Sequence, residues 1–409
     1  MSLRLLIPTI GTRGDLQPYI ALALVLDAAG YQTTIATHPA MRSLVEFYGI
    51  RFAPIGSDID IGIKTAAIRA HSPNWLLGFW RVMRFSFAML ESAHDDLLAL
   101  CRQTDCVLVS HTAAGSIEAD QLGVPTLSAT LFPQAIPVHD PDASPLKRVY
   151  DRLTGAAMGW MMTRPLNQIR RKFGVVKMGE YGITSPRLNL IAVSPHVFPP
   201  NPLWEPRHHM TGYWFAPAPQ QWEPDHALTA FLDEGEPPIV ISLGAMALGE
   251  SDARQSAQIA LAAIQQAGVR AIIQGWDEAF QRIELPAAIF HGGSIPHDWL
   301  LPRCSGLVHH GGFGTTAAGF RAGIPQVVIP HIIDQFIWGQ RAFELGVSVN
   351  PIPRAKLTSH SLADALCAIQ ADEGMKKQAG ALGAKISSEN GVQKAVELIQ
   401  KTVENQPSE

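Results

Sequence analysis

The chain has 409 residues, of which 47% are hydrophobic, and it carries a formal net charge of −4. This length predicts two domains with a core each, and the slightly acidic balance argues against a general nucleic-acid-binding protein. The four cysteines form no C-x-x-C pair, which favours reduced thiols and a cytoplasmic location. The apolar runs are too short for a signal segment or for the ~18 uncharged residues of a membrane span, so we expect a soluble chain.

In the first half, short apolar runs alternate with segments of helical periodicity, which predicts an α/β fold with a parallel, doubly wound sheet. The expected strands are 4–9, 32–37, 51–55, 106–110, 126–129 and 189–193. The expected helices are 17–30, about 74–101 and a segment that ends at 122. We therefore assign residues 1–200 to a first Rossmann-like domain.

A proline-rich linker is expected next, at residues 201–238. Ten of the thirty prolines fall within the 44 residues from 195 to 238, a density that regular elements do not tolerate. His208 and His209 lie in this segment and are expected to be solvated.

The alternation then restarts and predicts a second Rossmann-like domain over residues 239–385. Its expected strands are 239–243, 270–274, 288–291, 306–309 and 326–329, and its expected helices are 252–267, one at 315, one after 334 and 361–370. A last helix is expected within 386–409, where it could pack back on the first domain. Because both halves open with a strand, a glycine turn and a helix, we expect two similar domains that face each other across a cleft, with ligands at the carboxyl ends of the strands.

The most informative segment is 307–319, where a strand runs into a glycine-rich turn and a helix of small residues. Glycines let the backbone approach an anion, and the N–H groups and dipole of the helix attract it. His310 and Thr315 add side-chain donors, and Asp334 with Gln335 could hold sugar hydroxyls, which suggests a nucleotide-sugar site.

Two other interpretations of this turn stay open. Residues 312–317 also fit the G-x-G-x-x-A dinucleotide fingerprint, with Asp334 about 20 residues further on, and the glycines could serve packing alone. His309 and His310 are adjacent in a strand and point to opposite faces, so they cannot chelate one metal ion, and one of them is expected in the core.

Five motifs, in order along nearly the whole chain, resemble one family. They are Gly11–Pro18 (G-T-R-G-D-L-Q-P), Thr211–Trp214 (T-G-Y-W), Ile295–Leu300 (I-P-H-D-W-L), His309–Thr316 (H-H-G-G-F-G-T-T) and Asp334–Trp338 (D-Q-x-x-W). The chain resembles GT-B glycosyltransferases of the sterol and of the macrolide or glycopeptide glucosyltransferase type.

The resemblance implies a site residue by residue. It places a general base at Asp15, where plant relatives carry histidine. The donor-binding residues that it implies are Thr12, Gly14, Gly244, Ala245, His297, His310, Gly312, Gly314, Thr315, Thr316, Asp334 and Gln335. Ala245 stands where the family has a serine that contacts phosphate, and Ala318 stands where plant relatives have an acidic ribose contact. No prosthetic group is implied, and the expected co-substrate is UDP-glucose.

The chemistry of transfer is consistent with these assignments. A base must take the proton of the acceptor hydroxyl, and positive groups must stabilise the departing diphosphate. Asp15 can be that base, helped by partial desolvation, or it can simply cap the helix that follows it. His310 and the helix dipole can replace a metal ion, and a single displacement at the anomeric carbon would invert its configuration.

No metal site is expected. The two D-x-D tripeptides, Asp58–Asp60 and Asp140–Asp142, are interpreted as surface loops because neither follows a clear apolar strand inside a nucleotide domain.

Acceptor clues lie in the first half. The segment 75–90 is apolar nearly all round, which fits either a buried helix or the wall of a lipophilic pocket. The expected pocket residues are Trp75, Phe79, Trp80, Met83, Phe132 and Trp338. The stretch Lys147–Lys177 is strongly basic and could contact an anionic membrane, or it could be a solvated face.

These inferences predict a cytoplasmic, inverting, metal-independent hexosyltransferase that moves glucose from UDP-glucose to a hydroxyl of a sterol, triterpenoid, polyketide or flavonoid type of acceptor. An NAD-dependent oxidoreductase and a non-catalytic nucleotide-sugar- or lipid-binding protein are the alternatives. No nucleic acid partner is expected.

Overall fold

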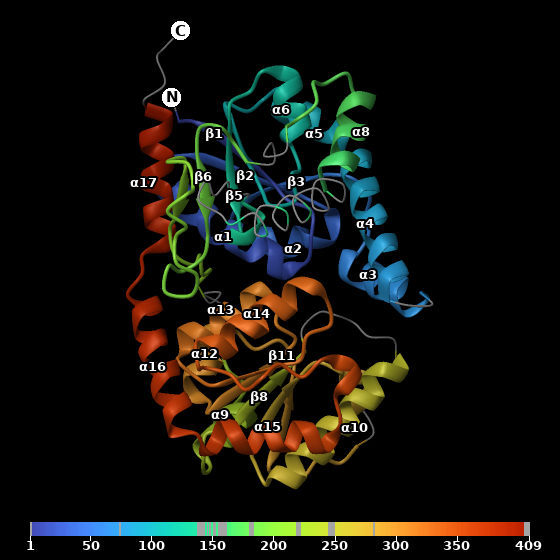
Figure 1. Ribbon diagram of the computed structural model, residues 1–409, viewed down its shortest axis with the longest axis vertical. Helices are drawn as coiled ribbons and strands as arrows, with labels where there is room; N and C mark the ends of the chain where they lie inside the picture. Colours follow the sequence, from blue (N-terminus) through green and yellow to red (C-terminus); the bar gives the residue numbers. More distant parts are fainter. Residues whose placement is uncertain are drawn as a thin grey trace. The chain divides into compact units, whose positions relative to one another are not determined.

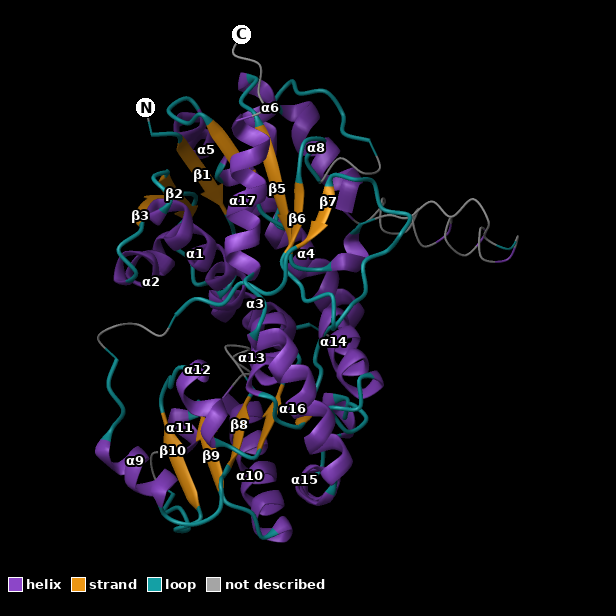
Figure 2. Ribbon diagram, turned by 90° about the vertical axis from the view of Figure 1, so that its left-hand side faces the viewer, coloured by secondary structure: helices purple, strands orange, loops and turns teal. Residues whose placement is uncertain are grey.

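The computed structural model describes residues 2–72, 75–136, 144, 146, 149, 153, 162–179, 184–217, 222–243, 250–280 and 283–404. It divides into two compact units: residues 1–61, 73–216 and 390–409 form the first, and residues 62–72 and 217–389 form the second. Each unit is a parallel sheet with helices packed on both faces (Figures 1 and 2). The predicted fold class, two doubly wound parallel-sheet domains, is confirmed.

The first sheet has seven strands in the order β3-β2-β1-β4-β5-β6-β7, all parallel. Their bounds are β1 Arg4–Pro8, β2 Gln32–Thr37, β3 Arg51–Pro54, β4 Cys106–Val109, β5 Thr126–Thr130, β6 Asn189–Ile191 and β7 His208–Met210. The chain winds outward from β1 to β3 and then returns to begin β4 on the other side of β1. The strands β1 and β4 are therefore neighbours where the winding reverses, which is where such sheets bind ligands.

The helices of the first half, followed by the C-terminal helix, are α1 Arg13–Ala28, α2 Arg42–Phe47, α3 Ile61–Ala70, α4 Trp75–Ser92, α5 His94–Cys101, α6 Ser116–Leu122, α8 Arg164–Lys172 and α17 Gly391–Glu404. The last of these, α17, packs on α1, and Lys394 donates to the carbonyl of Met210 at 2.8 Å. Residues 62–72, which include most of α3, group with the second unit although they belong to the first half of the sequence.

The second sheet has five parallel strands in the order β10-β9-β8-β11-β12. They are β8 Ile239–Ser242, β9 Ala271–Gln274, β10 Ile289–Gly292, β11 Gly306–His309 and β12 Gln326–Val328. Its winding reverses between β8 and β11. The helices of this half are α9 His226–Asp233, α10 Glu250–Ala267, α11 Asp277–Phe280, α12 His297–Leu300, α13 Phe313–Ala322, α14 Ile333–Glu344, α15 Ser359–Ala371 and α16 Glu373–Ser387.

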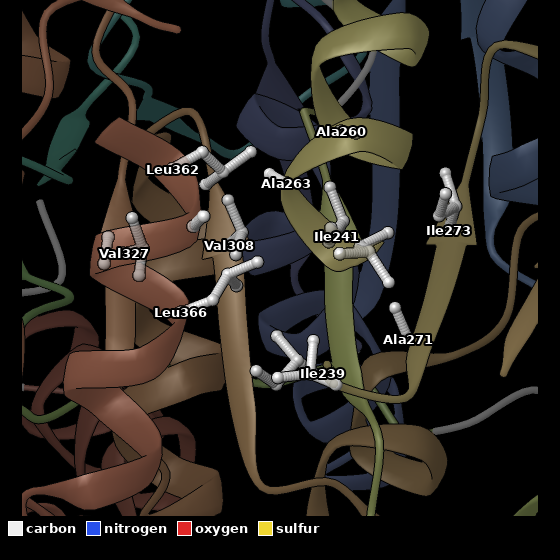
Figure 3. Packing of buried hydrophobic residues seen from close by; sticks show 14 of the residues in the cluster. Ile239, Ile241, Ala260, Ala263, Ala271, Ile273, Val308, Val327, Leu362 and Leu366 are labelled. Carbon is white, nitrogen blue, oxygen red and sulfur yellow. The ribbon is translucent and has the colours of Figure 1, made fainter. Parts of the chain in front are cut away.

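The second core shows why these apolar runs form strands. The helices α10 and α15 lie side by side on one face of the sheet, and their small and branched side chains meet those of the strands (Figure 3). Ile241, Val308 and Leu366 are at most 1% exposed. Because both faces of the sheet are covered, the strands are apolar throughout instead of alternating. Each such side chain contributes about 1.5–3 kcal/mol by burial.

Three expectations about elements need correction. The linker carries two regular elements, β7 and α9, because its prolines flank them: Pro206 precedes β7 and Pro224 precedes Asp225, which caps α9. His208 and His209 lie in β7 and are half-buried rather than solvated. Helix α16 was not predicted, since its many glycines and alanines give no strong periodicity; Asp372 caps its first turn.

None of the helices within the described ranges is long and apolar enough to cross a membrane.

Candidate active site

Asp15 lies in the first turn of α1, directly after β1. Its Oδ2 accepts hydrogen bonds from the backbone N–H and the hydroxyl of Thr12, at 2.8 and 2.9 Å. These bonds start the helix at Arg13, earlier than the predicted residue 17, and Asp15 stands at the third helical position rather than at the N-cap. A Cβ on Gly11 would lie 2.6 Å from Oδ2, so glycine leaves the room that this carboxylate needs.

The pair of Asp15 with His111 was not found from the sequence. Nε2 of His111 lies 3.3 Å from Oδ1 of Asp15. His111 follows β4, and β4 is the neighbour of β1, so the two residues meet where the winding of the first sheet reverses. The signal that could have found His111 is its place as a polar residue two positions after β4, the strand next to β1.

The protonation of Asp15 depends on these contacts. Burial alone would raise its pKa, but the hydrogen bonds from His111 and Thr12 together lower the pKa below its usual value. Asp15 is therefore ionised at neutral pH. Because its pKa is lowered, it is a weaker base than it would be if desolvation raised the pKa, as was expected from the sequence.

The turn that carries His111 is held in a strained shape. Ala113 has a φ of 60° and Gly115 a φ of 79°, and a Cβ on Gly115 would lie 2.6 Å from the ring of Pro8. The hydroxyl of Thr112 accepts from the backbone N–H of Ile10 at 3.4 Å, which ties the loop after β4 to the loop after β1. A positive φ in a non-glycine residue costs about 1–3 kcal/mol and is typical of functional sites.

In the second unit, the buried side chain of His309 is hydrogen-bonded to the backbone of the glycine-rich turn. It is completely buried at the end of β11, where its Nε2 donates to the side chain of Gln326 at 2.7 Å and its Nδ1 accepts the N–H of Gly311 at 3.1 Å. Burial lowers its pKa to about 3, so the ring is neutral. His309 is thus the core histidine of the adjacent pair, as one of the two was expected to be.

His310 lies over the start of α13. A Cβ on Gly312, the N-cap of this helix, would lie 2.4 Å from Nε2 of His310, so the glycine makes room for the ring. Nδ1 of His310 is buried without a hydrogen-bond partner, and burial followed by the nearby His297 lowers the pKa of His310 to about 4. A buried, unpaired ring nitrogen beside a helix N-terminus is suited to a phosphate group.

Other predicted donor residues have structural partners. The hydroxyl of Thr316 is buried and donates to the carbonyl of Gly312 at 2.9 Å, so it stabilises the turn. The side-chain carbonyl of Gln335 accepts the N–H of His331 at 2.7 Å and closes the start of α14. Gln335 is 2% exposed, so this side chain is part of the packed turn. Asp334 is exposed, and Gly314 and Thr315 lie in the first turn of α13.

Two basic side chains near this turn were missed from the sequence. His331 follows β12, and its Nε2 is buried without a partner; burial, then His310, Arg354 and Arg69, lower its pKa to about 3. Arg69 of α3 also interacts with the charge of Asp334. Neither residue has a local motif, because each reaches the turn from a distant part of the chain.

The remaining predicted residues are dispersed. Phe79 and Trp80 of α4 contact each other edge-to-face at 6.1 Å, and Trp80 is 37% exposed. Met83 and Phe132 are half-buried. Trp338 is 1% exposed and packs on Phe313 at 5.6 Å, so it belongs to the core of the second unit rather than to a pocket wall.

Some predicted residues cannot be placed. Gly244, Ala245, the aspartates 140 and 142, and the side chain of Trp75 lie outside the described residues, as does much of 147–161. Thr12 uses both of its donors on Asp15, and Gly14 is exposed in the first turn of α1. Within the described part of the chain, no three His, Cys, Asp or Glu side chains are grouped as they would be around a metal ion.

Comparisons with known proteins identify the family of the chain. Residues 5–134 match the family model of the glycosyltransferase family 28 N-terminal domain, and residues 260–404 match that of the erythromycin biosynthesis protein CIII-like C-terminal domain. The chain is 32% identical over 426 residues to O-mycaminosyltylonolide 6-deoxyallosyltransferase of Streptomyces fradiae, covering 98% of each protein. The chain belongs to this glycosyltransferase family. It is therefore an enzyme that transfers a hexosyl group.

Plant and fungal members of the family are similar to a comparable degree. A sterol 3-beta-glucosyltransferase of Arabidopsis thaliana is 30% identical over 421 residues, and the match covers 97% of this glycosyltransferase and 67% of the plant protein. For a sterol 3-beta-glucosyltransferase of Pichia angusta the identity is 32%, and the match covers 34% of the fungal protein.

Solved structures confirm the GT-B fold. The glycosyltransferase of kitacinnamycin has a TM-score of 0.76 at 17% identity and covers 98% of this glycosyltransferase. The glycosyltransferase VinC, solved in complex with dTDP, has a TM-score of 0.71 at 22% identity and also covers 98%.

Proposed function

We propose that this glycosyltransferase moves glucose from UDP-glucose to a hydroxyl of a lipophilic small molecule of the sterol, triterpenoid, polyketide or flavonoid type. The transfer inverts the anomeric carbon and needs no metal ion. The observation that carries the proposal is the turn between β11 and α13, where the unpaired Nδ1 of His310 lies beside the start of a helix whose N-cap is Gly312. That arrangement supplies positive potential to a diphosphate.

The relatives support this proposal without deciding the substrates. Two of them are named as sterol glucosyltransferases and one as a deoxyallosyltransferase of a tylonolide, and several solved neighbours hold thymidine diphosphate. A nucleoside diphosphate sugar and a large apolar alcohol are the common elements. The family of the chain favours this activity over the oxidoreductase that the G-x-G-x-x-A match also fitted.

The experiment is a screen of UDP-, dTDP- and GDP-glucose against sterols, triterpenoids, macrolides and flavonoids, read by mass spectrometry for a hexose adduct. We expect turnover with UDP-glucose that survives EDTA, and a β-linked product by NMR. Turnover that EDTA abolishes and Mg²⁺ or Mn²⁺ restores would contradict the metal-free mechanism. Tight donor binding without transfer to any of these acceptors would contradict the proposed acceptor class.

Donor binding should strengthen as the pH falls. In the free enzyme the pKa values of His310 and His331 are lowered to about 4 and about 3, so both rings are neutral at pH 6. A bound diphosphate raises both values, and binding therefore takes up protons at a pH between the free and bound pKa values.

Calorimetry of UDP binding in two buffers of different ionisation enthalpy measures this uptake. We expect His310→Ala and His331→Ala each to reduce the uptake at pH 6, and each to weaken binding of UDP more than that of uridine. The phosphate of the nucleotide titrates in the same way in all variants. Any difference in proton uptake between a variant and wild type therefore comes from the replaced histidine. Equal uptake in wild type and variants would show that neither ring senses the phosphate.

We also propose a cytoplasmic enzyme that rests on membranes through part of 147–177. Leu146, Val149 and Leu153 are 86%, 56% and 65% exposed, so three apolar side chains in or directly beside this stretch face solvent. The basic residues of α8 contribute less, because Arg170 is paired with Asp120 and Lys172 with Glu91. Binding to anionic liposomes that is lost on Leu146→Ser with Leu153→Ser would support this contact, and unchanged binding would contradict it.

A further inference from the structure

Gln274, the last residue of β9, lies at the same edge of the second sheet as the glycine-rich turn. In the parallel register it pairs with Ser242 of the neighbouring strand β8, and Ser242 pairs with His309 of β11 (Figure 2). Gln274 and His309 are therefore two strands apart, about 10 Å. Asp334, which was expected to hold the sugar, follows β12 on the other side of β11. A diphosphate beside β11 then places the nucleoside on the side of β8 and β9.

The side chain of Gln274 ties two loops of this edge together. Its Nε2 donates to the carbonyl oxygens of Ile295 and Gly293, at 3.1 and 3.4 Å. Both residues belong to the loop between β10 and α12, and that loop ends at His297. Burial and then the nearby His297 lower the pKa of His310. The loop that Gln274 holds is thus next to the residue proposed to bind the diphosphate.

The turn after β9 has an unusual backbone conformation. Gly275 has a φ of 89° and Trp276 a φ of 61°. Nε2 of His291, in β10, donates to the carbonyl oxygen of Gly275 at 2.9 Å and holds the turn. A positive φ is rare for a bulky residue and is typical of ligand-binding and active sites. The strained turn points to a binding role for this edge, independently of the contacts of Gln274.

The side-chain oxygen of Gln274 has no hydrogen-bond partner within the described part of the chain. Oε1 is buried and unpaired, and its assignment is fixed because both neighbours of the amide nitrogen are carbonyl oxygens, which need a donor. Asp277, another acceptor at this turn, is 71% exposed, so water satisfies it. A buried oxygen without a donor is unfavourable and rare. A bound molecule that brings an N–H group to this edge would satisfy Oε1.

We propose that Gln274 selects the nucleobase of the sugar donor by accepting a hydrogen bond from a ring N–H. This deepens the proposed function and rests on it. Uracil and thymine carry such a donor at N3 and guanine carries one at N1, whereas cytosine and adenine have an acceptor nitrogen at that place. An acceptor nitrogen would face Oε1 lone pair to lone pair and leave both unpaired. A site built to pair a polar group of its substrate rejects an analogue that lacks this group.

The test compares UDP with CDP by calorimetry, in the full-length wild type and in Gln274→Lys. The two ligands share the ribose and the diphosphate, so the ratio of their Kd values isolates the base and cancels any effect of the new charge on the phosphates. A lysine can still donate to the carbonyls of Ile295 and Gly293, but it offers no acceptor. We expect wild type to bind UDP about 100-fold more tightly than CDP, and Gln274→Lys to reduce this preference to within about three-fold.

Two further variants keep the result interpretable. Gln274→Met is neutral and of similar length, and it should lose the preference in the same way. Gln265→Lys, at an exposed glutamine of α10, is the matched control and should keep the ratio of wild type. Equal affinity of wild type for UDP and CDP, or a wild-type ratio in either Gln274 variant, would overturn the proposal. Selective UDP binding without transfer to any acceptor would instead refute the proposed function and leave Gln274 as the residue that selects the base.

Discussion

Replacing Asp15 by asparagine is expected to lower kcat by ~10²–10⁴, because the acceptor hydroxyl loses its positioned base. Asparagine can still accept the N–H of Thr12, which is bound at 2.8 Å, so α1 should begin at the same residue. The amide group is neutral and cannot take the proton of the acceptor hydroxyl. The residues that bind the diphosphate are unchanged, so UDP affinity should stay within a few-fold of wild type. Steady-state kinetics and calorimetry measure the two effects separately.

The matched control is Asp58→Asn, which changes an exposed aspartate of the same unit. It also tests the metal alternative, since Asp58 begins one of the two D-x-D tripeptides. We expect its turnover to equal that of wild type. Near-normal turnover of Asp15→Asn would place the base elsewhere, and a severe loss in Asp58→Asn would contradict the interpretation of Asp58–Asp60 as a surface loop without a metal.

The residues found from the sequence and those missed differ in a physical way. The glycine-rich turn was recognised because its requirements are local: a strand, glycines with room for an anion, and a helix start within a few residues. His111, His331 and Arg69 have no such signature, because each acquires its role only when a remote segment is brought to the same sheet edge. Knowing that ligands bind where the winding reverses would have pointed to the residue after β4, but the strand order is not visible in the sequence.

The same difference between local signals and contacts of remote segments applies to the elements of the fold. Apolar runs such as β1 and β8 predicted buried strands, since four consecutive buried residues suit only a sheet covered on both faces. Helix α1 was predicted to start four residues too late because its first turn is polar and is fixed by Asp15 and Thr12 rather than by apolar periodicity. In the linker, β7 was missed because its pairing with β6 is a long-range contact, which overrides the local effect of prolines.

The stability of the first unit is expected to depend strongly on His94. Its Nδ1 lies 2.6 Å from Oε1 of Glu118, the two side chains are 6% and 3% exposed, and Phe173 stacks on the imidazole at 3.4 Å. His94→Ala leaves the Glu118 carboxylate buried without this partner, which typically costs about 3–5 kcal/mol. Urea unfolding at pH 7.5 measures the loss, and His360→Ala is the exposed control.

The pH dependence of this loss separates charge from packing. Burial raises the pKa of Glu118, and the hydrogen bond from His94 opposes that rise. Without His94 the pKa rises further, and a carboxyl group whose folded pKa is raised destabilises the fold as the pH increases through that pKa. The penalty of His94→Ala should therefore be smaller at pH 5 than at pH 7.5, because protonated Glu118 carries no charge. Adding Glu118→Leu should recover much of the loss at pH 7.5, since an apolar side chain suits this core better than an unpaired carboxylate. An equal penalty at both pH values, with no recovery in the double variant, would assign the effect to the lost packing on Phe173 instead.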